Sequence, residues 1–241
     1  MTRKNRLSDV ASKLVASVLL LACLSLIWLS WHRGTGNLYM QQGQQLIRHW
    51  QQGGQFEHQL FLQAEQSLQT AIDRHPQHPN YPLVLGKLYQ WQAFLQPEQA
   101  ETALNLAYQH LQLSAELRPS WPTTWIDLAQ VSYELAGNQW QANSQFYWQQ
   151  AQQHGALFEP MLNTEISLLM RAWPQISPVQ QQQFLQKIVY IQDHHGLSRH
   201  LFSQARQHER LAALCTFVGL SQQTERLAAS YLYRQNCAIP N

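Results

Sequence analysis

A spacing of small and apolar residues occurs twice in this chain, and it restricts the fold more than any other feature. The first copy is Ala64, Leu68, Ala71 and Pro76, and the second, 43 positions later, is Ala107, Leu111, Ser114 and Pro119. Self-similarity at one fixed period is typical of helical repeat arrays, in which each helix pair buries its apolar face by stacking on its neighbour. The spacing therefore predicts an all-α helical repeat, or α-solenoid. Such arrays usually hold partners, so the spacing favours an adapter over an enzyme.

The N-terminal region contains an uncharged run of 18 residues, 14–31, made mostly of Leu, Val, Ala and Ser. As a helix it would be about 27 Å long, close to the ~30 Å hydrocarbon core of a bilayer. The basic residues that precede it are Arg3, Lys4, Arg6 and Lys13. Only Arg33 follows closely, and this asymmetry keeps the N-terminus of a single-span protein in the cytoplasm. We expect a single-pass anchor in a bacterial inner membrane, with the following domain in the periplasm.

Two other interpretations of the apolar run stay open. A cleaved signal peptide needs a site with small residues two positions apart after a shorter apolar core, and residues 28–33 offer none. Leu20 to Cys23 loosely resembles a bacterial lipoprotein cleavage box, but the apolar run continues through Trp31. Both interpretations therefore fit the run less well than an anchor does.

Changes of composition and hydrophobic pattern divide the chain into five expected segments. These are a basic cytoplasmic N-terminus at 1–13, an anchor at 14–31, a glycine-containing neck at 32–54 with room for a short helix at 38–50, repeats at 55–155, and a C-terminal helical continuation or cap at 156–241. Apolar periodicity and proline positions predict a helix from Phe56 to His75 and further helices at 80–94, 98–117, 123–137, 139–153, 160–172, 178–194, 198–217 and 221–235. No segment alternates with the period of two that is typical of a strand.

The repeated positions resemble the tetratricopeptide repeat, whose first helix carries Leu-Gly followed by Tyr, as Leu85-Gly86 and Tyr89 do here. The resemblance implies half a repeat at 56–76, a complete repeat at 79–119 and a looser one at 122–154. Small residues let the helices approach closely, and large ones such as Tyr89, Trp125 and Phe146 are expected to fill the adjoining spaces. The period of 43 residues departs from the family period of about 34.

The whole layout also resembles the VpsP-like exopolysaccharide-biosynthesis proteins of Gram-negative bacteria. The shared features are a short basic N-terminus, one span, a neck, the repeat region, the stretch from Arg118 to Trp125, and C-terminal helices that carry Cys215 and Cys237. This resemblance implies an inner-membrane accessory protein of capsule or biofilm polysaccharide assembly. It brings no catalytic residues and no cofactor to the chain.

The motifs of common enzyme classes are missing from the sequence. It has no glycine-rich phosphate loop, nucleophile elbow, H-E-x-x-H or C-x-x-C. Asp127 and Glu134 would share one helix face and could not converge on a glycosidic bond. Histidines cluster between Asp193 and His208, but Gly196 breaks the spacing that two ligands on one helix need. We therefore expect no enzyme activity, metal or cofactor.

The charged residues make nucleic acid an unlikely partner. The net charge is +2, and beyond the N-terminus the Lys and Arg residues are scattered, with no basic stripe.

Aromatic residues are the best candidates for a binding site. Those concentrated in the expected repeats are Trp91, Trp121, Trp125, Tyr133 and Trp140. Aromatic side chains anchor interfaces because they bury a large area with little loss of conformational freedom. The alternative is that they form the repeat core. Trp121 and Trp140 adjoin turns, so we expect these two to be the most exposed.

Cys215 and Cys237 are candidates for a disulfide, which an exported domain would permit. If 198–217 and 221–235 form a simple antiparallel hairpin, Cys215 lies near its turn and Cys237 beyond its far end. The tail would then have to fold back to bring the Cα atoms within about 7 Å. The sequence leaves this pairing open.

Three functions fit these observations. The first is a membrane-anchored adapter that holds the proteins of exopolysaccharide biosynthesis or export. The second is an adapter of another envelope assembly, such as a pilus, a secretion system or cytochrome maturation. The third is a module that binds polysaccharide directly through its aromatic residues.

Overall fold

The computed structural model describes residues 2–237, with the side chains of 2–12, 29, 32 and 33 excepted. All regular elements in this range are helices, so the all-α prediction is confirmed. The chain divides into two compact units, Met1–Trp91 and Gln92–Asn241. The side chains of the expected cytoplasmic segment 1–13 lie outside the described part, apart from that of Lys13.

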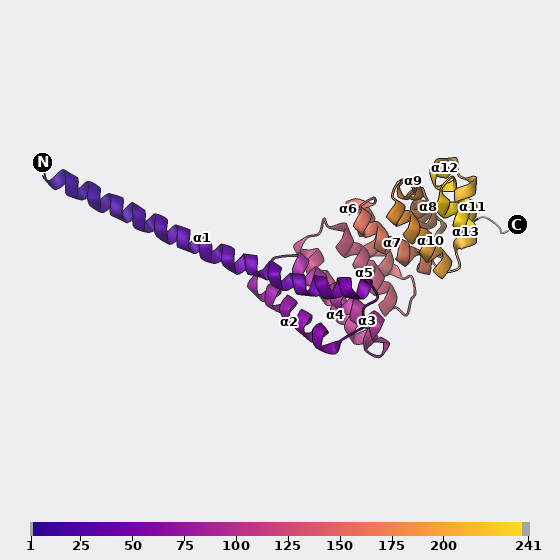
Figure 1. Cartoon of the computed structure of the whole chain (residues 1–241), viewed down its shortest axis with the longest axis horizontal. Helices are drawn as coiled ribbons and strands as arrows, with labels where there is room; N and C mark the ends of the chain where they lie inside the picture. The colour runs from indigo at the N-terminus through magenta and orange to yellow at the C-terminus, as the bar shows by residue number, and fades with distance from the viewer. Residues whose placement is uncertain (1, 238–241) are drawn as a thin grey trace. The chain divides into compact units, whose positions relative to one another are not determined.

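The first unit is built on a long helix, α1 (Thr2–Gln51), which is followed by α2 (His58–Arg74) and the greater part of α3 (Asn80–Leu95). The C-terminal part of α1 lies beside α2 (Figure 1). Leu46, Ile47 and Trp50 of α1 are buried in this contact region. On α2, Phe61 and the expected stripe of Ala64, Leu68 and Ala71 are buried. The helix stops at the proline-rich turn that the sequence predicted there.

Two glycines make the contact between α1 and its neighbours close. A Cβ built on Gly36 would lie 2.6 Å from the Tyr81 hydroxyl, and one on Gly43 would lie 2.5 Å from Leu68 Cδ1. The predicted neck at 32–54 is helical as far as Gln51, so the short helix expected at 38–50 is part of the longer helix α1. Its glycines look like loop residues in sequence, but two of them provide space for helix packing.

The packing predicts different effects for two glycines of the same helix. Replacing Gly43 with Leu forces a side chain into the buried Leu68, and overpacking of this kind costs about 1–3 kcal/mol of unfolding free energy. A Cβ on Gly34 meets nothing within 4 Å. Gly34→Leu should leave the stability unchanged or raise it by up to about 1 kcal/mol, because Leu favours a helix more than Gly does. Thermal unfolding of both variants in detergent, followed by circular dichroism, checks this. Equal thermal unfolding midpoints for Gly43→Leu and Gly34→Leu would contradict the observed packing.

The second unit contains the remaining helices. They are η1 (Pro97–Gln99), α4 (Ala100–Leu117), α5 (Pro122–Leu135), α6 (Ala142–Gly155), α7 (Glu159–Ala172), α8 (Pro178–Gln186), α9 (Ile188–Ile191), α10 (His195–Gln207), α11 (Leu211–Leu220), η2 (Gln222–Thr224), α12 (Glu225–Ala228) and α13 (Tyr231–Cys237). Ala107, Leu111 and Ser114, the second copy of the spacing, are buried on α4. One apolar core runs from Ile126 to Leu227, across the junction at 155/156 between the expected repeats and their C-terminal continuation.

The last predicted helices are interrupted in the structure. The expected helix 198–217 ends as α10 at Gln207 and resumes as α11 at Leu211, with Glu209 between them at a φ of 58°. That backbone conformation cannot continue a right-handed helix. The expected helix at 178–194 is likewise divided near Lys187. Its start is defined by a capping box, in which Ser177 and Gln180 satisfy each other's backbone N–H groups.

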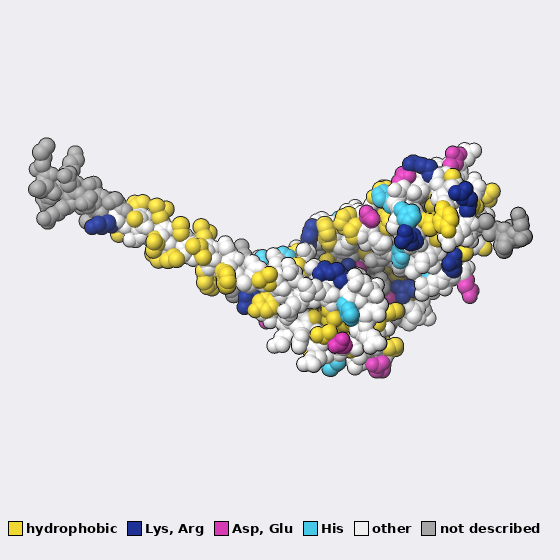
Figure 2. All heavy atoms as spheres, in the orientation of Figure 1, with side chains coloured by type: hydrophobic (Ala, Val, Ile, Leu, Met, Phe, Trp, Pro, Cys, Tyr) yellow, Lys and Arg dark blue, Asp and Glu magenta, His cyan; other side chains and the backbone are white. Residues whose placement is uncertain are grey.

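The apolar run of α1 is exposed in the part of the chain that the structure describes. Its large apolar side chains between Leu14 and Trp28 are 55–65% exposed, and Trp31 is 74% exposed. Figure 2 shows this part of α1 as a nearly uncharged hydrophobic rod. Among the residues that the structure describes, no helix combines the length and the apolar character needed to cross a membrane. The predicted span 14–31 is thus unconfirmed, and it includes Leu29, whose side chain lies outside the described part.

Candidate functional site

Four aromatic side chains from successive helices of the second unit form a cluster at its surface. We call Tyr108 of α4, Trp125 of α5, and Phe146 and Tyr147 of α6 the aromatic cluster. Tyr147 lies at its centre, with its ring centroid 6.1 Å from that of Tyr108, 6.1 Å from that of Trp125 and 5.3 Å from that of Phe146. Phe146 is 51% exposed, whereas the other three side chains are half-buried.

Hydrogen bonds hold the rings of the aromatic cluster in place. The hydroxyl groups of Tyr108 and Tyr147 are 2.7 Å apart and form one hydrogen bond, in which either hydroxyl can be the donor. Burial, together with this hydrogen bond, raises the pKa of Tyr108 to about 12, so the Tyr108 phenol remains neutral near pH 7. The indole N–H of Trp125 donates to the carbonyl of Pro119 at 2.6 Å. The cluster therefore offers a preorganised aromatic surface, which suits contact with an apolar side chain or the C–H face of a sugar ring.

Trp121 lies next to this surface, at the start of α5. The guanidinium carbon of Arg118 is 3.7 Å from its ring centroid, which is a cation–π contact. Phe158 meets the same ring edge-on, with centroids 5.2 Å apart. Trp121 is half-buried, so these contacts leave only part of it accessible.

The other three candidate residues do not join this surface. Tyr133 is only 3% exposed and belongs to the core. Trp140 packs beside it at a centroid distance of 6.3 Å and is also part of the core layer, against our expectation of marked exposure. Trp91 belongs to the first unit, where its ring lies 6.4 Å from that of Trp50. Of the five candidate residues, Trp125 thus belongs to the aromatic cluster, and Trp121 precedes it by four residues as the N-cap of α5.

Sequence reasoning assigned Phe146 to the core and passed over Tyr108 and Tyr147. The core aromatic of α6 is Trp148, which is 1% exposed and two residues from Phe146. Two residues correspond to about 200° around a helix, so Phe146 and Trp148 must point in opposite directions. A prediction that Trp148 faces the core would therefore also have predicted that Phe146 faces the surface.

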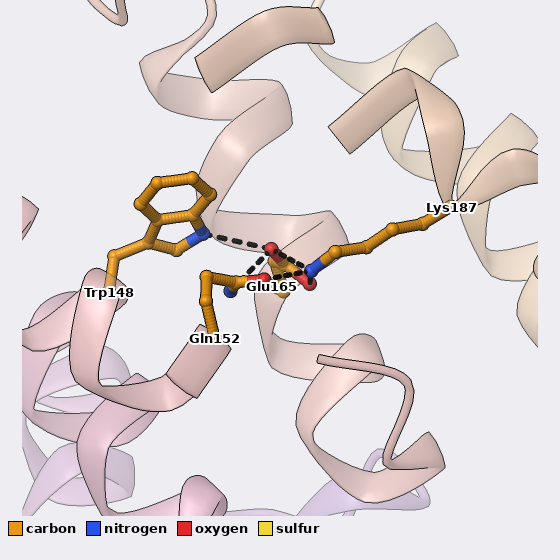
Figure 3. A network of polar contacts seen from close by, with 4 residues as sticks. All are labelled: Trp148, Gln152, Glu165 and Lys187. Atoms are coloured by element: carbon orange, nitrogen blue, oxygen red, sulfur yellow. Dashed lines mark hydrogen bonds and ion pairs between the residues drawn. The ribbon is translucent and has the colours of Figure 1, made fainter. Parts of the chain in front are cut away.

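A buried polar network lies deeper in the same unit (Figure 3). Both carboxylate oxygens of Glu165 on α7 are 2.7 Å from Lys187 Nζ. Glu165 also accepts hydrogen bonds from Trp148 Nε1 at 2.8 Å and Gln152 Nε2 at 2.9 Å, both on α6. Lys187 donates in addition to Gln152 Oε1. The Glu165 side chain is fully buried and that of Lys187 is 8% exposed.

The network connects helices and presents no reactive group to solvent. Burial lowers the pKa of Lys187, while the ion pair with Glu165 opposes that shift. The carboxylate has no oxygen left without a donor, so its role is to join α6 and α7 to the segment between α8 and α9. The sequence signal was a single Glu on the apolar face of α7, between Met161 and Ile166, which must find a partner if it is buried.

Cys215 of α11 and Cys237 of α13 form a disulfide, with their Cα atoms 5.5 Å apart. The tail folds back as the pairing requires, because the segment expected as one helix is divided into η2, α12 and α13. The Tyr233 hydroxyl donates to the Cys215 carbonyl and supports this return. Within the described residues, no three His, Cys, Asp or Glu side chains are placed to hold a metal ion.

The comparisons with known proteins give no match. No family model fits this chain, and no curated protein is significantly similar to it.

Proposed function

We propose that this chain is a membrane-anchored, periplasm-facing adapter with a tetratricopeptide-like α-solenoid. It supports exopolysaccharide biosynthesis or export by holding partner proteins, and it is not an enzyme. The observation that carries the adapter role is the aromatic cluster, which joins three successive helices at the surface of the repeat region. The polysaccharide pathway comes from the family resemblance of the sequence.

The anchor rests on the apolar run 14–31. Charged side chains are missing from the run, and basic residues precede it. In the structure its large side chains are exposed to the surroundings, which in water would be unfavourable over such a length. A bilayer would cover them. The disulfide between Cys215 and Cys237 agrees with a domain in an oxidising compartment.

The partner surface rests on the chemistry of the aromatic cluster. Phe146 and the half-buried rings of Trp125 and Tyr147 present a large, rigid apolar area. Interface hot spots are rich in such residues, because rigid rings lose little conformational entropy on binding. Arg118, which lies over Trp121 at the same end of α5, adds a positive charge at the margin.

A photo-reactive phenylalanine at position 146, used in intact cells, tests the proposal. We expect cross-links to proteins of polysaccharide synthesis or export, identified by mass spectrometry after detergent extraction. The same photo-reactive residue at Gln182, which is exposed on α8, is the control and should give none of these products. Cross-links to pilus, secretion or cytochrome-maturation proteins would contradict the polysaccharide pathway and assign the adapter to that other assembly. Cross-links to glycan without any protein would favour direct polymer binding.

Truncation of the same side chain should separate binding from stability. Phe146→Ala removes an exposed ring, so the free energy of unfolding should stay within about 0.5 kcal/mol of the parent. Loss of an aromatic interface anchor usually costs about 2 kcal/mol or more of binding, which corresponds to roughly thirtyfold in affinity. Copurification of the partner measures the binding loss and thermal unfolding measures the stability. Gln182→Ala, an exposed change on α8, should alter neither.

A further inference from the structure

The C-terminal part of α1 is held by the first unit from residue 35 onward. Arg74 of α2 donates to the Thr35 hydroxyl, and its guanidinium carbon lies 4.7 Å from the ring centroid of Tyr39. The Tyr81 hydroxyl of α3 donates to Asn37 Oδ1 at 3.1 Å. These contacts begin four residues after Trp31, the last residue of the apolar run. Along a helix, four residues span only about 6 Å.

The same part of α1 continues the 43-residue period. Gly43 stands 43 positions before Gly86, which stands 43 positions before Ala129. In the structure all three are buried helical residues, and Gly43 packs against Leu68 of α2, one of the residues that define the period. The half repeat expected at 56–76 is therefore completed by the end of α1, which serves as its first helix.

We infer that the anchor and the first repeat share one continuous helix, so that the first repeat is held at the membrane surface and its partner is a protein bound to or embedded in that membrane. This inference rests on the proposed function, since that function places 14–31 in the bilayer. A flexible neck of 23 residues would have a reach of roughly 25 Å. The helical connection gives the first repeat almost no reach away from the membrane. A protein that contacts the first repeat must therefore itself lie at the bilayer.

Pulsed electron-spin distance measurements on the full chain test the continuity without a partner. Spin labels go on Ser25→Cys and Gln66→Cys in a Cys23→Ser background, in which the disulfide leaves no other free thiol among the described cysteines. The control pair is Gln45→Cys with Gln66→Cys, which lies wholly within the packed part of α1 and α2. We expect distance distributions of similar width. A much broader distribution for the first pair would overturn the continuous helix, whatever the chain binds.

Energy transfer in vesicles tests the position at the membrane. A dye on Gln66→Cys should transfer strongly to acceptor headgroups in vesicles of phosphatidylethanolamine and phosphatidylglycerol. Insertion of two helical turns, about seven residues, between Arg33 and Gly34 moves the first repeat about 10 Å away from the membrane. The insertion leaves the orientation of the repeat about the helix axis nearly unchanged. That variant should transfer less. A chain that binds the vesicles without strong transfer would overturn this inference alone, whereas a chain that does not bind them would overturn the anchor as well.

Cross-linking in cells tests the class of partner. A photo-reactive residue at Gln45, which is exposed on the packed part of α1, should capture a membrane-associated protein in the parent chain. The two-turn insertion should reduce that product at least severalfold while cross-links from position 146 persist. Capture of soluble proteins only, or a yield that the insertion leaves unchanged, would overturn the inference.

Discussion

Lys187→Met should destabilise the second unit by about 3–5 kcal/mol, the usual cost of removing one partner from a buried ion pair. The change leaves the fully buried carboxylate of Glu165 with two neutral donors, Trp148 and Gln152, and without a counter-charge. Met has a similar length and apolar character to the Lys side-chain stem, so packing around it is largely kept. Chemical denaturation followed by tryptophan fluorescence measures the loss.

The double variant Glu165→Gln with Lys187→Met should recover most of that loss. Its neutral amide can still accept from Trp148 and can donate to Gln152, whose oxygen Lys187 no longer uses. Replacing a buried ion pair with neutral groups of similar volume is often neutral or stabilising. Arg226→Met, in the exposed pair with Asp193, is the control and should cost less than about 1 kcal/mol. If Lys187→Met lowered the free energy of unfolding as little as Arg226→Met does, the network would not be what connects the helices.

Removal of the disulfide should loosen the C-terminal helices. Cys215 and Cys237 are 22 residues apart, and closing a loop of that length stabilises a chain by about 3 kcal/mol in the chain-entropy account. α13 has no buried residue of its own, so it depends on this bond and on contacts such as that of Tyr233. In the variant Cys215→Ser with Cys237→Ser, hydrogen exchange should accelerate across 211–237.

Two comparisons make the disulfide result specific. Exchange in α4 to α7 should change less, because Leu214, Val218 and Leu227 are the only buried apolar residues that the described part of the tail adds to the shared core. Cys23→Ser removes the exposed free cysteine of α1 and should leave exchange across 211–237 unaltered. Unchanged protection of the tail in the double variant would show that packing alone holds α13.

Helix positions in the middle of the chain were predictable because local signals agree there. Apolar periodicity and the prolines at 76, 97 and 119 place α2, α3 and α4 within a few residues of their observed bounds. Toward the C-terminus the signals weaken. The break at Glu209 depends on a positive φ angle, which a glutamate does not predict from sequence. The two helices α10 and α11 were therefore expected as one.

The candidate site was predictable only in part. Trp121 and Trp125 were chosen for their residue type, and the structure places them at the N-cap and in the first turn of α5, both half-buried. Tyr133 was chosen for the same reason and is buried. Residue type alone cannot separate these cases, because an aromatic ring is equally suited to a core and to an interface.

The sequence by itself determined that the chain is all-α, that small residues recur every 43 positions, and that an uncharged apolar run precedes them. These properties depend on the pattern of residues along the chain, and the periodicity of that pattern can be observed directly in the sequence. Tertiary structure decided that the expected neck is a repeat helix, that Glu165 pairs with Lys187, and that Cys237 returns to Cys215. Each of these outcomes depends on residues that lie 22 or more positions apart, which meet only when helices pack.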